Sequence, residues 1–326
     1  MRVLYIASSI KRPFSFLDRA IVHGMKELNI GVKTMLVNND FSRTWISTIN
    51  RWKPDMILVM LGWKLKAKHL RLLDKVSIPK AIWYTDDPYA IDRAVKTCRH
   101  FDAVFTIDSA AIPVYKERGC KHVYHLPLAA PHSFFTPRSV AAKYHSQVLL
   151  LGMSFDNRKD EIRRLMPLLR KYKTLLVGPG WDKVVRRRKG SPKVVNEWVS
   201  PLEAMRYYNG ADIVLNIHRS SDDSFLKLNT LKVAAYTPNN RIFEVASCSS
   251  FQLTSYRPDL PKLYELPDEM VAYKEWEQLH DLIPYYIEHE NERLQIKQKA
   301  YQRTLADHLY AHRLRNLLQR MKKISG

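Results

Sequence analysis

Apolar and polar positions alternate along the chain in two rhythms, one typical of buried strands and the other of amphipathic helices. A continuous apolar run at 3–7 predicts the first buried strand. In the segment that follows, Leu17, Ile21 and Met25 recur at helical spacing and fall on one face. Strand and helix patterns keep alternating in this way, which predicts βαβ units and parallel sheets.

The same two patterns place the remaining elements. Strands are predicted at 3–7, 31–37, 56–60, 80–85, 103–106, 122–126, 147–152, 174–177, 194–195, 212–217 and 251–254. Helices are predicted at 16–28, 45–52, 66–75, 110–119, 159–172 and 201–208, from Arg241 onward, and from 275 to the end.

A proline-bearing loop at 127–137 separates two such alternations and marks a domain boundary. We therefore predict an α/β protein with two Rossmann-like domains, at 1–140 and 141–285. A basic, amphipathic helical tail is predicted at 286–326.

Composition and charge narrow the partners but do not choose among them. The 326 residues contain 53 lysines and arginines against 32 aspartates and glutamates, a formal net charge of +21. This balance predicts attraction to an anion, which can be a nucleic acid, a membrane surface, an acidic glycopolymer or a nucleotide.

The cysteines and the apolar runs predict a cytoplasmic protein, with peripheral membrane contact as the other possibility. Three cysteines without a CxxC pair argue against a zinc site or a disulfide framework. The first segment resembles a strand rather than a signal peptide. The apolar run at 56–63 is too short to span a bilayer.

Several enzyme classes lack their motifs in this chain. The first strand-to-helix turn reads SSIKRP, without the GxGxxG of dinucleotide-binding proteins, so a dehydrogenase is not expected. HExxH, GxSxG, GxxxxGK[ST] and DxD are also absent, and we expect neither a metal nor another cofactor.

Two adjacent acids follow a predicted strand of the first domain. Asp86 and Asp87 lie in the sequence YTDDP, at the carboxyl end of a strand, where open α/β sheets bind ligands. They are candidates for a general base, a residue that orients a sugar hydroxyl, or a metal ligand. The alternative is an Asp-Pro turn that caps the next helix.

Basic residues follow a predicted strand of the second domain in the same way. Arg158 and Lys159, after the turn that begins at Gly152, form a candidate phosphate clamp. A solvated charge run is the alternative. His218 ends a later strand, although a single histidine is more often structural. The basic run at 184–189 is interpreted as a solvated loop, with contact to an acidic acceptor as the alternative.

The segment 237–264 combines a turn, the start of a helix and a short strand. Asn240 is predicted to cap the helix, and Glu244 lies on its first turn. A helix start attracts anions such as a diphosphate. The simpler interpretation of Glu244 is favourable interaction with the helix dipole.

Several of these stretches resemble one family. They are NNRIFEVASCSSFQLTSYRPDLPKLYE from Asn239, LPDEMVAYKEWEQLHDLIPYYIEHENERLQI from Leu266, YTDDP, and the link at 127–135. Together they resemble the GT-B glycosyltransferases, specifically the CgeB-like spore-maturation branch of the group-1 transferases.

The resemblance implies that the second domain binds a nucleotide-sugar donor. Glu244 then matches the residue that holds the ribose hydroxyls, and Arg158 the residue that contacts the diphosphate. Trp198 and Val199 fall in the loop that contacts the base, and Asn240 and Arg241 lie beside the phosphates. Asn157 and His218 complete the predicted donor site. Asp86 or Asp87 would face the donor sugar and the acceptor.

The expected function is therefore metal-independent, hexosyltransferase-type sugar transfer. The resemblance implies a UDP- or GDP-sugar donor and an anionic glycan or protein acceptor on a spore or cell surface, with no nucleic acid.

Two other functions remain open. An inactive GT-B-like module that binds an anionic polymer is suggested by Ser249-Ser250, where the family has a glycine pair, and by Tyr236, where many relatives have an acid. A nucleic-acid-binding protein is suggested only by the net charge.

Overall fold

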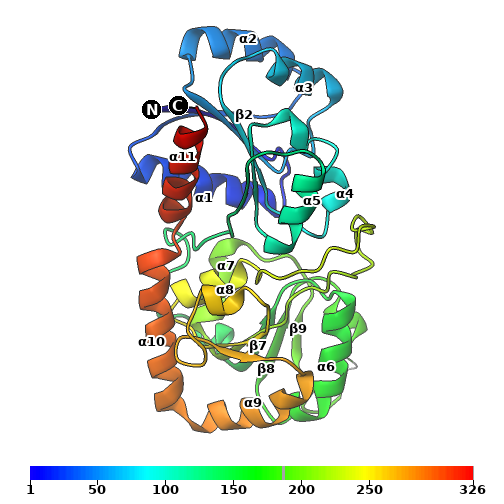
Figure 1. Ribbon diagram of the computed structural model, residues 1–326. Helices are drawn as coiled ribbons and strands as arrows, with labels where there is room; N and C mark the ends of the chain where they lie inside the picture. The colour runs from blue at the N-terminus through cyan, green and yellow to red at the C-terminus, as the bar shows by residue number, and fades with distance from the viewer. Residues whose placement is uncertain (186–187, 326) are drawn as a thin grey trace. The chain divides into compact units, whose positions relative to one another are not determined.

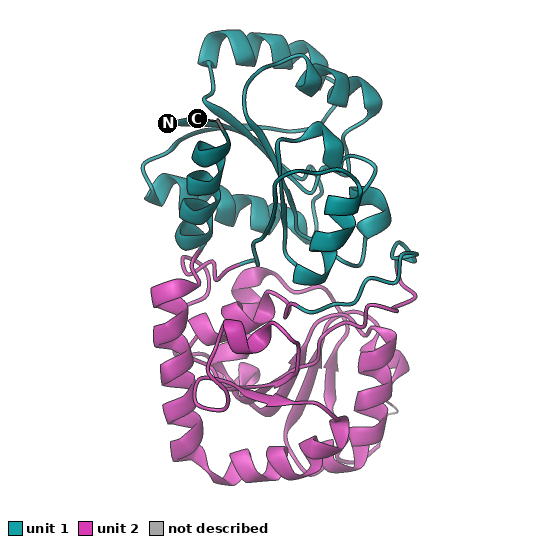
Figure 2. Ribbon diagram, viewed as in Figure 1, with its two compact units in different colours: residues 1–128, 226–236, 310–326 teal, residues 129–225, 237–309 magenta. Residues whose placement is uncertain are grey.

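The computed structural model describes residues 1–185 and 188–325, which form two compact units with one sheet each (Figure 1). Unit 1 comprises residues 1–128, 226–236 and 310–326, and unit 2 comprises residues 129–225 and 237–309 (Figure 2). These units differ from the predicted domains, whose boundaries were placed after residues 140 and 285. Unit 1 is assembled from three separate segments, and the tail is shared between the units.

Six parallel strands form the sheet of unit 1, in the order β2-β1-β3-β4-β5-β6. The strands are β1 Arg2–Ile6, β2 Gly31–Met35, β3 Met56–Met60, β4 Lys80–Tyr84, β5 Ala103–Thr106 and β6 Val123–His125. The helices of this unit are α1 Phe14–Glu27, α2 Phe41–Trp52, α3 Ala67–Asp74, α4 Ile91–Ala94, α5 Ile112–Glu117 and α11 Tyr310–Ser325. The central strand β3 is buried along its whole length, as expected for a parallel sheet with helices on both faces.

Helix α11 belongs to unit 1 because it packs closely on α1. A Cβ atom added to Gly24 of α1 would lie 3.0 Å from the Cβ of Tyr310 and 3.0 Å from Leu314. The ring of Tyr310 also meets Trp83 of β4 edge to face, with 6.3 Å between the centroids. The last helix therefore covers part of the core of the first domain.

Six parallel strands also form the sheet of unit 2, in the order β12-β11-β10-β7-β8-β9. The strands are β7 Ser146–Leu151, β8 Thr174–Val177, β9 Lys193–Val195, β10 Ala211–Asn216, β11 Gln252–Ser255 and β12 Val271–Tyr273. The helices are α6 Asp156–Leu169, α7 Pro201–Asn209, α8 Arg241–Ser247, α9 Leu279–Glu288 and α10 Glu290–Asp307.

The predicted α/β class with two Rossmann-like sheets is confirmed. Two details were wrong. Strand β12 was not predicted, and the helix expected from 275 to the end is interrupted at His289, whose ψ is 65°, and again at His308. A single apolar stripe can run through such interruptions, so the sequence pattern alone does not reveal them.

Candidate functional site

Two glycines bring the backbones of neighbouring loops together at the carboxyl edge of the unit 2 sheet. Gly152 follows β7 and has a φ of 140°, and Gly178 follows β8 and has a φ of 133°. A Cβ atom on Gly178 would lie 2.3 Å from the carbonyl oxygen of Gly152, so a larger residue does not fit. That carbonyl accepts a hydrogen bond of 2.8 Å from the indole of Trp181.

Arg158 anchors the loop that begins at Gly152. It lies in the first turn of α6 and is 4% exposed. Its Nε donates to the carbonyl of Ile217 at 2.8 Å, and its Nη1 donates to the carbonyl of Met153 at 2.9 Å. The guanidinium therefore ties the start of α6 to the end of β10. Its predicted contact with a diphosphate stays a prediction.

A second guanidinium, that of Arg241 at the start of α8, packs against the loop that begins at Gly152. A Cβ atom on Gly152 would be 2.6 Å from Nη2 of Arg241 and 3.0 Å from Nη1 of Arg158. Arg241 donates from Nη1 to Oδ1 of Asn216 at 3.1 Å. Its Nε is buried and has no hydrogen-bond partner within residues 1–185 and 188–325. Two adjacent cations with an unpaired buried donor favour an anionic ligand.

Glu244 lies one helical turn beyond Arg241 and is 8% exposed. Its carboxylate accepts a hydrogen bond from the side-chain amide of Asn240. Burial raises the pKa of Glu244 to about 7, and the charge of Arg241 opposes this rise. Near neutral pH this carboxyl group is therefore only partly ionised, and its negative charge balances the two positive guanidiniums only in part.

The predicted cap of α8 was wrong. The backbone of Asn240 is already helical and its side chain makes no cap hydrogen bond, because its amide donates to Glu244 instead. The backbone N–H of Arg241 donates to Oδ1 of Asn239 at 3.1 Å. Asn239 also donates to Asn216 at 3.0 Å, so the turn before α8 is held against the end of β10.

Asn157 and His218 support this edge of the sheet. Asn157 donates to the carbonyl of His218 at 2.8 Å and accepts from the N–H of Ser220 at 3.2 Å. His218 is buried against Thr254, and burial together with nearby guanidiniums lowers its pKa well below the usual value. The imidazole is therefore neutral and structural at neutral pH. Contact of either residue with a donor stays a prediction.

The predicted base-contacting loop follows β9, an edge strand of this sheet. Trp198 is 41% exposed, and Val199 is half-buried. Ser200 caps α7 by accepting from the N–H of Glu203 at 3.3 Å, which fixes where the loop ends. An exposed indole on an ordered loop is suited to stacking on a planar ring.

Glu161 lies next to this cluster and was not considered in the sequence analysis. It lies one turn beyond Arg158 on α6 and accepts a hydrogen bond of 3.3 Å from Tyr273. Burial raises its pKa to about 7. The spacing of three residues from Arg158 was the available signal, because such pairs share one face of a helix.

A sequence relative decides the family. The chain is 30% identical over 308 residues to "Spore protein CgeB" of Bacillus subtilis (strain 168), with 94% of each chain covered. Residues 158–319 also match the "Glycosyl transferase-like" family model. The chain belongs to the CgeB family of glycosyltransferases.

Solved structures confirm that this CgeB-family chain has the GT-B fold. A sucrose-phosphate synthase from Thermosynechococcus elongatus matches with a TM-score of 0.67 and 11% identity, over 100% of both chains. An alpha-glucosyltransferase in complex with UDP and a 13-mer DNA matches with a TM-score of 0.68 and 10% identity, over 99% of both. Anabaena Alr3699/HepE in complex with UDP and glucose matches with a TM-score of 0.64 and 11% identity, over 99% of this chain and 100% of its own.

The serine pair that replaces the CgeB-like glycine pair adopts the backbone that a glycine would favour. Ser249 has a φ of 50°, in the left-handed region. The hydroxyl of Ser250 donates to the carbonyl of Tyr208 at 2.9 Å. Ser249 thus takes the left-handed turn that follows α8, and Ser250 ties this turn to α7.

In unit 1 of the CgeB-family chain, the two predicted acids follow β4. Asp86 is half-buried and Asp87 is 3% exposed. The carboxylate of Asp87 accepts from Oγ1 of Thr106 at 2.6 Å and from the hydroxyl of Tyr115 at 2.7 Å. Burial raises the pKa of Asp87 to about 7. Asp87 thus links β4 to β5 and α5, and a catalytic role for either acid stays a prediction.

Replacing Asp87 with alanine will lower the free energy of unfolding by about 2 kcal/mol, because two buried hydroxyls lose their acceptor. Asp87→Asn keeps an acceptor oxygen and will cost less than about half as much. Urea unfolding followed by circular dichroism measures both changes. Equal stability of the alanine variant and the parent protein would contradict this account of the two hydrogen bonds.

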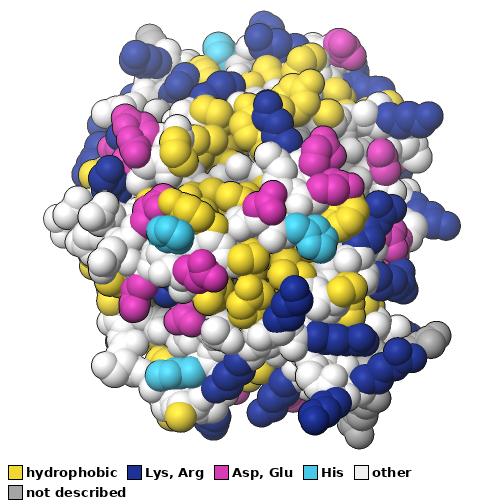
Figure 3. Space-filling model, turned by 90° about the horizontal axis from the view of Figure 1, so that it is seen from below, with side chains coloured by type: hydrophobic (Ala, Val, Ile, Leu, Met, Phe, Trp, Pro, Cys, Tyr) yellow, Lys and Arg dark blue, Asp and Glu magenta, His cyan; other side chains and the backbone are white. Residues whose placement is uncertain are grey.

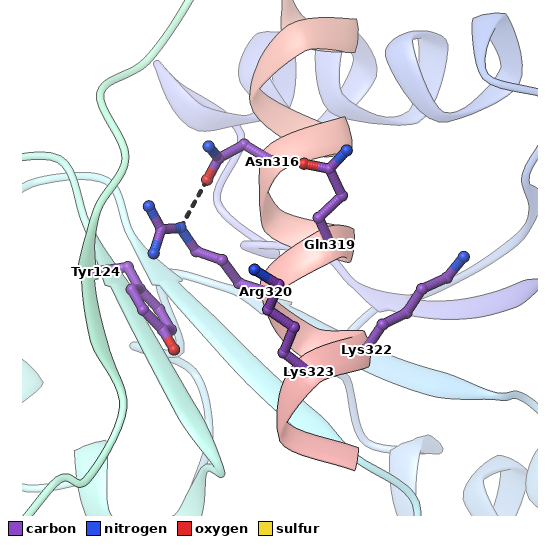
Figure 4. A pocket seen from close by; sticks show the side chains of 6 residues that line it. All are labelled: Tyr124, Asn316, Gln319, Arg320, Lys322 and Lys323. Carbon is purple, nitrogen blue, oxygen red and sulfur yellow. Dashed lines mark hydrogen bonds between the residues drawn. The ribbon is translucent and has the colours of Figure 1, made fainter. Parts of the chain in front are cut away.

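A separate basic pocket lies on unit 1 between β6 and α11, with a volume of about 650 Å³ (Figure 4). Tyr124, Asn316, Gln319, Arg320, Lys322 and Lys323 line it. The guanidinium of Arg320 lies over the ring of Tyr124, 4.4 Å from its centroid, and its Nε donates to Asn316 at 2.9 Å. This pocket, called the α11 pocket below, is not part of the unit 2 site.

Two further searches concern metals and membranes. Within residues 1–185 and 188–325, no group of three or more histidine, cysteine, aspartate or glutamate side chains is arranged to hold a metal ion. Among the helices of the same residues, none has the length and the apolar character needed to cross a bilayer. Part of the basic run at 184–189 lies outside the described residues.

Proposed function

We propose that this glycosyltransferase uses a uridine diphosphate sugar and transfers the sugar to an anionic glycan or glycoprotein. The observation that carries the proposal is the pair of guanidiniums around Gly152, with the unpaired Nε of Arg241 between β7 and α8. Glu244 lies one turn beyond this pair. Guanidinium donors suit a diphosphate, and a carboxylate acceptor suits the hydroxyls of a ribose.

The geometry assigns each group a chemical task. Arg241 would bind the diphosphate, while Arg158 holds the loop of Gly152 and adds positive charge. As the bond between the sugar and the β-phosphate breaks, negative charge grows on the departing diphosphate. Guanidiniums that are already in place stabilise this charge without reorganising, which lowers the barrier.

The carboxylate of Glu244 would accept hydrogen bonds from the ribose hydroxyls. Asn240 already orients it, so little side-chain entropy is lost on binding. Uridine is proposed because structural neighbours, Alr3699/HepE and the alpha-glucosyltransferase, are described as complexes with UDP. Trp198 is proposed to stack on the base.

We also propose that transfer needs no metal ion, because the two arginines supply the positive charge that a divalent cation would otherwise supply. The name of the Bacillus relative makes a spore-surface glycan the acceptor to test first.

The direct test is a thermal-shift measurement with UDP, GDP and dTDP, followed by an assay of sugar release from the matching donors. UDP should raise the melting temperature most, and UDP-sugars should be turned over. No shift with any nucleotide would overturn the donor site. A shift without turnover for any donor would favour an inactive module instead.

Adding EDTA will leave the UDP-induced shift and the rate of transfer unchanged within about twofold, because the proposed phosphate ligands are guanidiniums. The measurement compares metal-stripped protein with protein to which magnesium or manganese is returned. A rate that falls on stripping and returns with either metal would contradict metal independence.

A further inference from the structure

The positive charge of the chain is concentrated in unit 1. The segments of unit 1 contain 28 lysines and arginines against 11 aspartates and glutamates, a net charge of +17. Unit 2 contains 25 against 21, a net charge of +4. Seen from the side of α9, basic and acidic side chains are intermixed (Figure 3). The donor site therefore accounts for little of the excess, and unit 1 needs its own explanation.

Part of this charge gathers on three adjacent loops at the carboxyl edge of the unit 1 sheet. Strands β1, β3 and β4 are neighbours in the parallel sheet, so the loops that follow them share one edge. Five exposed cations lie on these loops and at the helix starts beyond them: Lys11, Arg12, Lys64, Lys66 and Arg93. Within the described part of the chain, none of the five forms an ion pair with an acid.

Trp63 holds the three loops together. Its ring meets that of Phe14 at 5.6 Å between centroids, and Phe14 comes two residues after Arg12. The guanidinium carbon of Arg93 lies over the same indole, 4.9 Å from its centroid. Trp63 thus connects the β3 loop to the starts of α1 and α4, and the other four cations lie within three residues of Phe14 or Trp63 in the sequence. We call this group, Lys11, Arg12, Trp63, Lys64, Lys66 and Arg93, the Trp63 surface.

Four acids lie on the same loops or on the helices that follow them: Asp18, Asp86, Asp87 and Asp92. Asp18 accepts from Ser8 and from the hydroxyl of Tyr5. Asp87 is buried, and Asp92 accepts from the backbone N–H of Thr230 at 2.9 Å. Within the described residues, none of these acids forms an ion pair with a cation of the Trp63 surface, so the five basic side chains remain available to an external anion.

We propose that the Trp63 surface binds an anionic glycan through its acidic groups. This inference rests on the proposed function in one respect, namely that the bound glycan would be the acceptor of the transferred sugar. A nucleic acid fits less well, because binding of single strands relies on aromatic faces that are free to stack on bases. Here Arg93 lies over the indole of Trp63, and Phe14 meets the same ring. The indole of Trp63 positions the guanidinium of Arg93, and the parallel N–H groups of a guanidinium suit a carboxylate or a phosphate.

The test measures binding of full-length protein to polygalacturonate oligomers, with uncharged dextran and single-stranded DNA as comparison ligands. The parent protein should bind polygalacturonate and not dextran. Replacing both lysines in Lys64→Gln/Lys66→Gln should weaken binding about tenfold. Lys322→Gln/Lys323→Gln removes the same charge from the α11 pocket and should change affinity less than about twofold.

Three results would overturn the proposal: equal loss in both double variants, equal binding of dextran, or tighter binding of DNA that is lost in the Lys64/Lys66 variant. All four substituted lysines are exposed, so the folds should survive, and unliganded melting temperatures verify this. The UDP-induced shift of each variant is recorded in the same samples. A normal UDP shift with no glycan binding rejects this inference alone, and the reverse result rejects only the donor site.

Discussion

Replacing Arg241 with alanine will weaken UDP binding about 100-fold, because the variant loses at least one charge-assisted hydrogen bond to the diphosphate. The unpaired Nε makes this effect larger than that of an ordinary surface arginine. In the free protein this buried N–H group makes no hydrogen bond, so none has to be broken when the ligand binds. Calorimetry with UDP measures the change.

Two comparison variants isolate the role of the Arg241 fork. Arg241→Lys keeps the charge but not the planar donors, and it should recover only part of the affinity, remaining about tenfold weaker than the parent. Arg163→Ala removes an exposed arginine from α6 of the same unit, where it pairs with Asp160 at 2.8 Å. This control should bind UDP normally. An Arg241→Ala protein that melts normally and binds UDP as tightly as the control would reject the diphosphate site.

Replacing Glu244 with glutamine will weaken binding of UDP-glucose about 30-fold but leave binding of the 2′,3′-dideoxy analogue nearly unchanged, since only the first ligand offers ribose hydroxyls. The parent protein should therefore prefer the hydroxylated ligand strongly, and the variant should not. Glu288→Gln changes an exposed acid on α9 and should retain the preference. A preference that persists in Glu244→Gln would remove the ribose assignment.

The same residue makes donor binding depend on pH. Burial raises the pKa of Glu244 to about 7, and ribose hydroxyls donate to the ionised form. As the pH falls below 7 the carboxylate is protonated, so affinity for UDP-glucose should drop about tenfold between about pH 8 and pH 6. Glu244→Gln should remove most of this dependence. UDP-glucose is used because its diphosphate has no terminal group that titrates near pH 6.

Strand positions followed from the sequence where an apolar run was long and bounded by turns. Strands β3, β5 and β8 have the predicted bounds because each combines these features. Strand β12, Val271–Tyr273, was not predicted, although β6 and β9, which are equally short, were. The breaks at His289 and His308 were hidden because backbone angles change there while helical spacing continues on both sides.

For the site, the sequence identified the loops more reliably than the tasks of single side chains. Arg158 and Arg241 were both expected near phosphates, and they do flank one loop. Only the structure distinguishes them, since Arg158 donates to two carbonyls while Arg241 keeps a free Nε. The direction in which a long side chain points depends on residues distant in sequence. Here these residues are Asn216 and Ile217, at the end of β10.

The discontinuous make-up of unit 1 has a consequence for how the protein is synthesised. Residues 226–236 and 310–326 complete this unit, and α11 packs on α1 near Gly24. The first domain therefore cannot finish folding from residues 1–128 alone, because the face of α1 that contacts α11 stays uncovered until residues 310–326 have also left the ribosome. Unit 2 needs no segment beyond residue 309. During translation, the carboxyl-terminal domain is thus the first whose segments are all available.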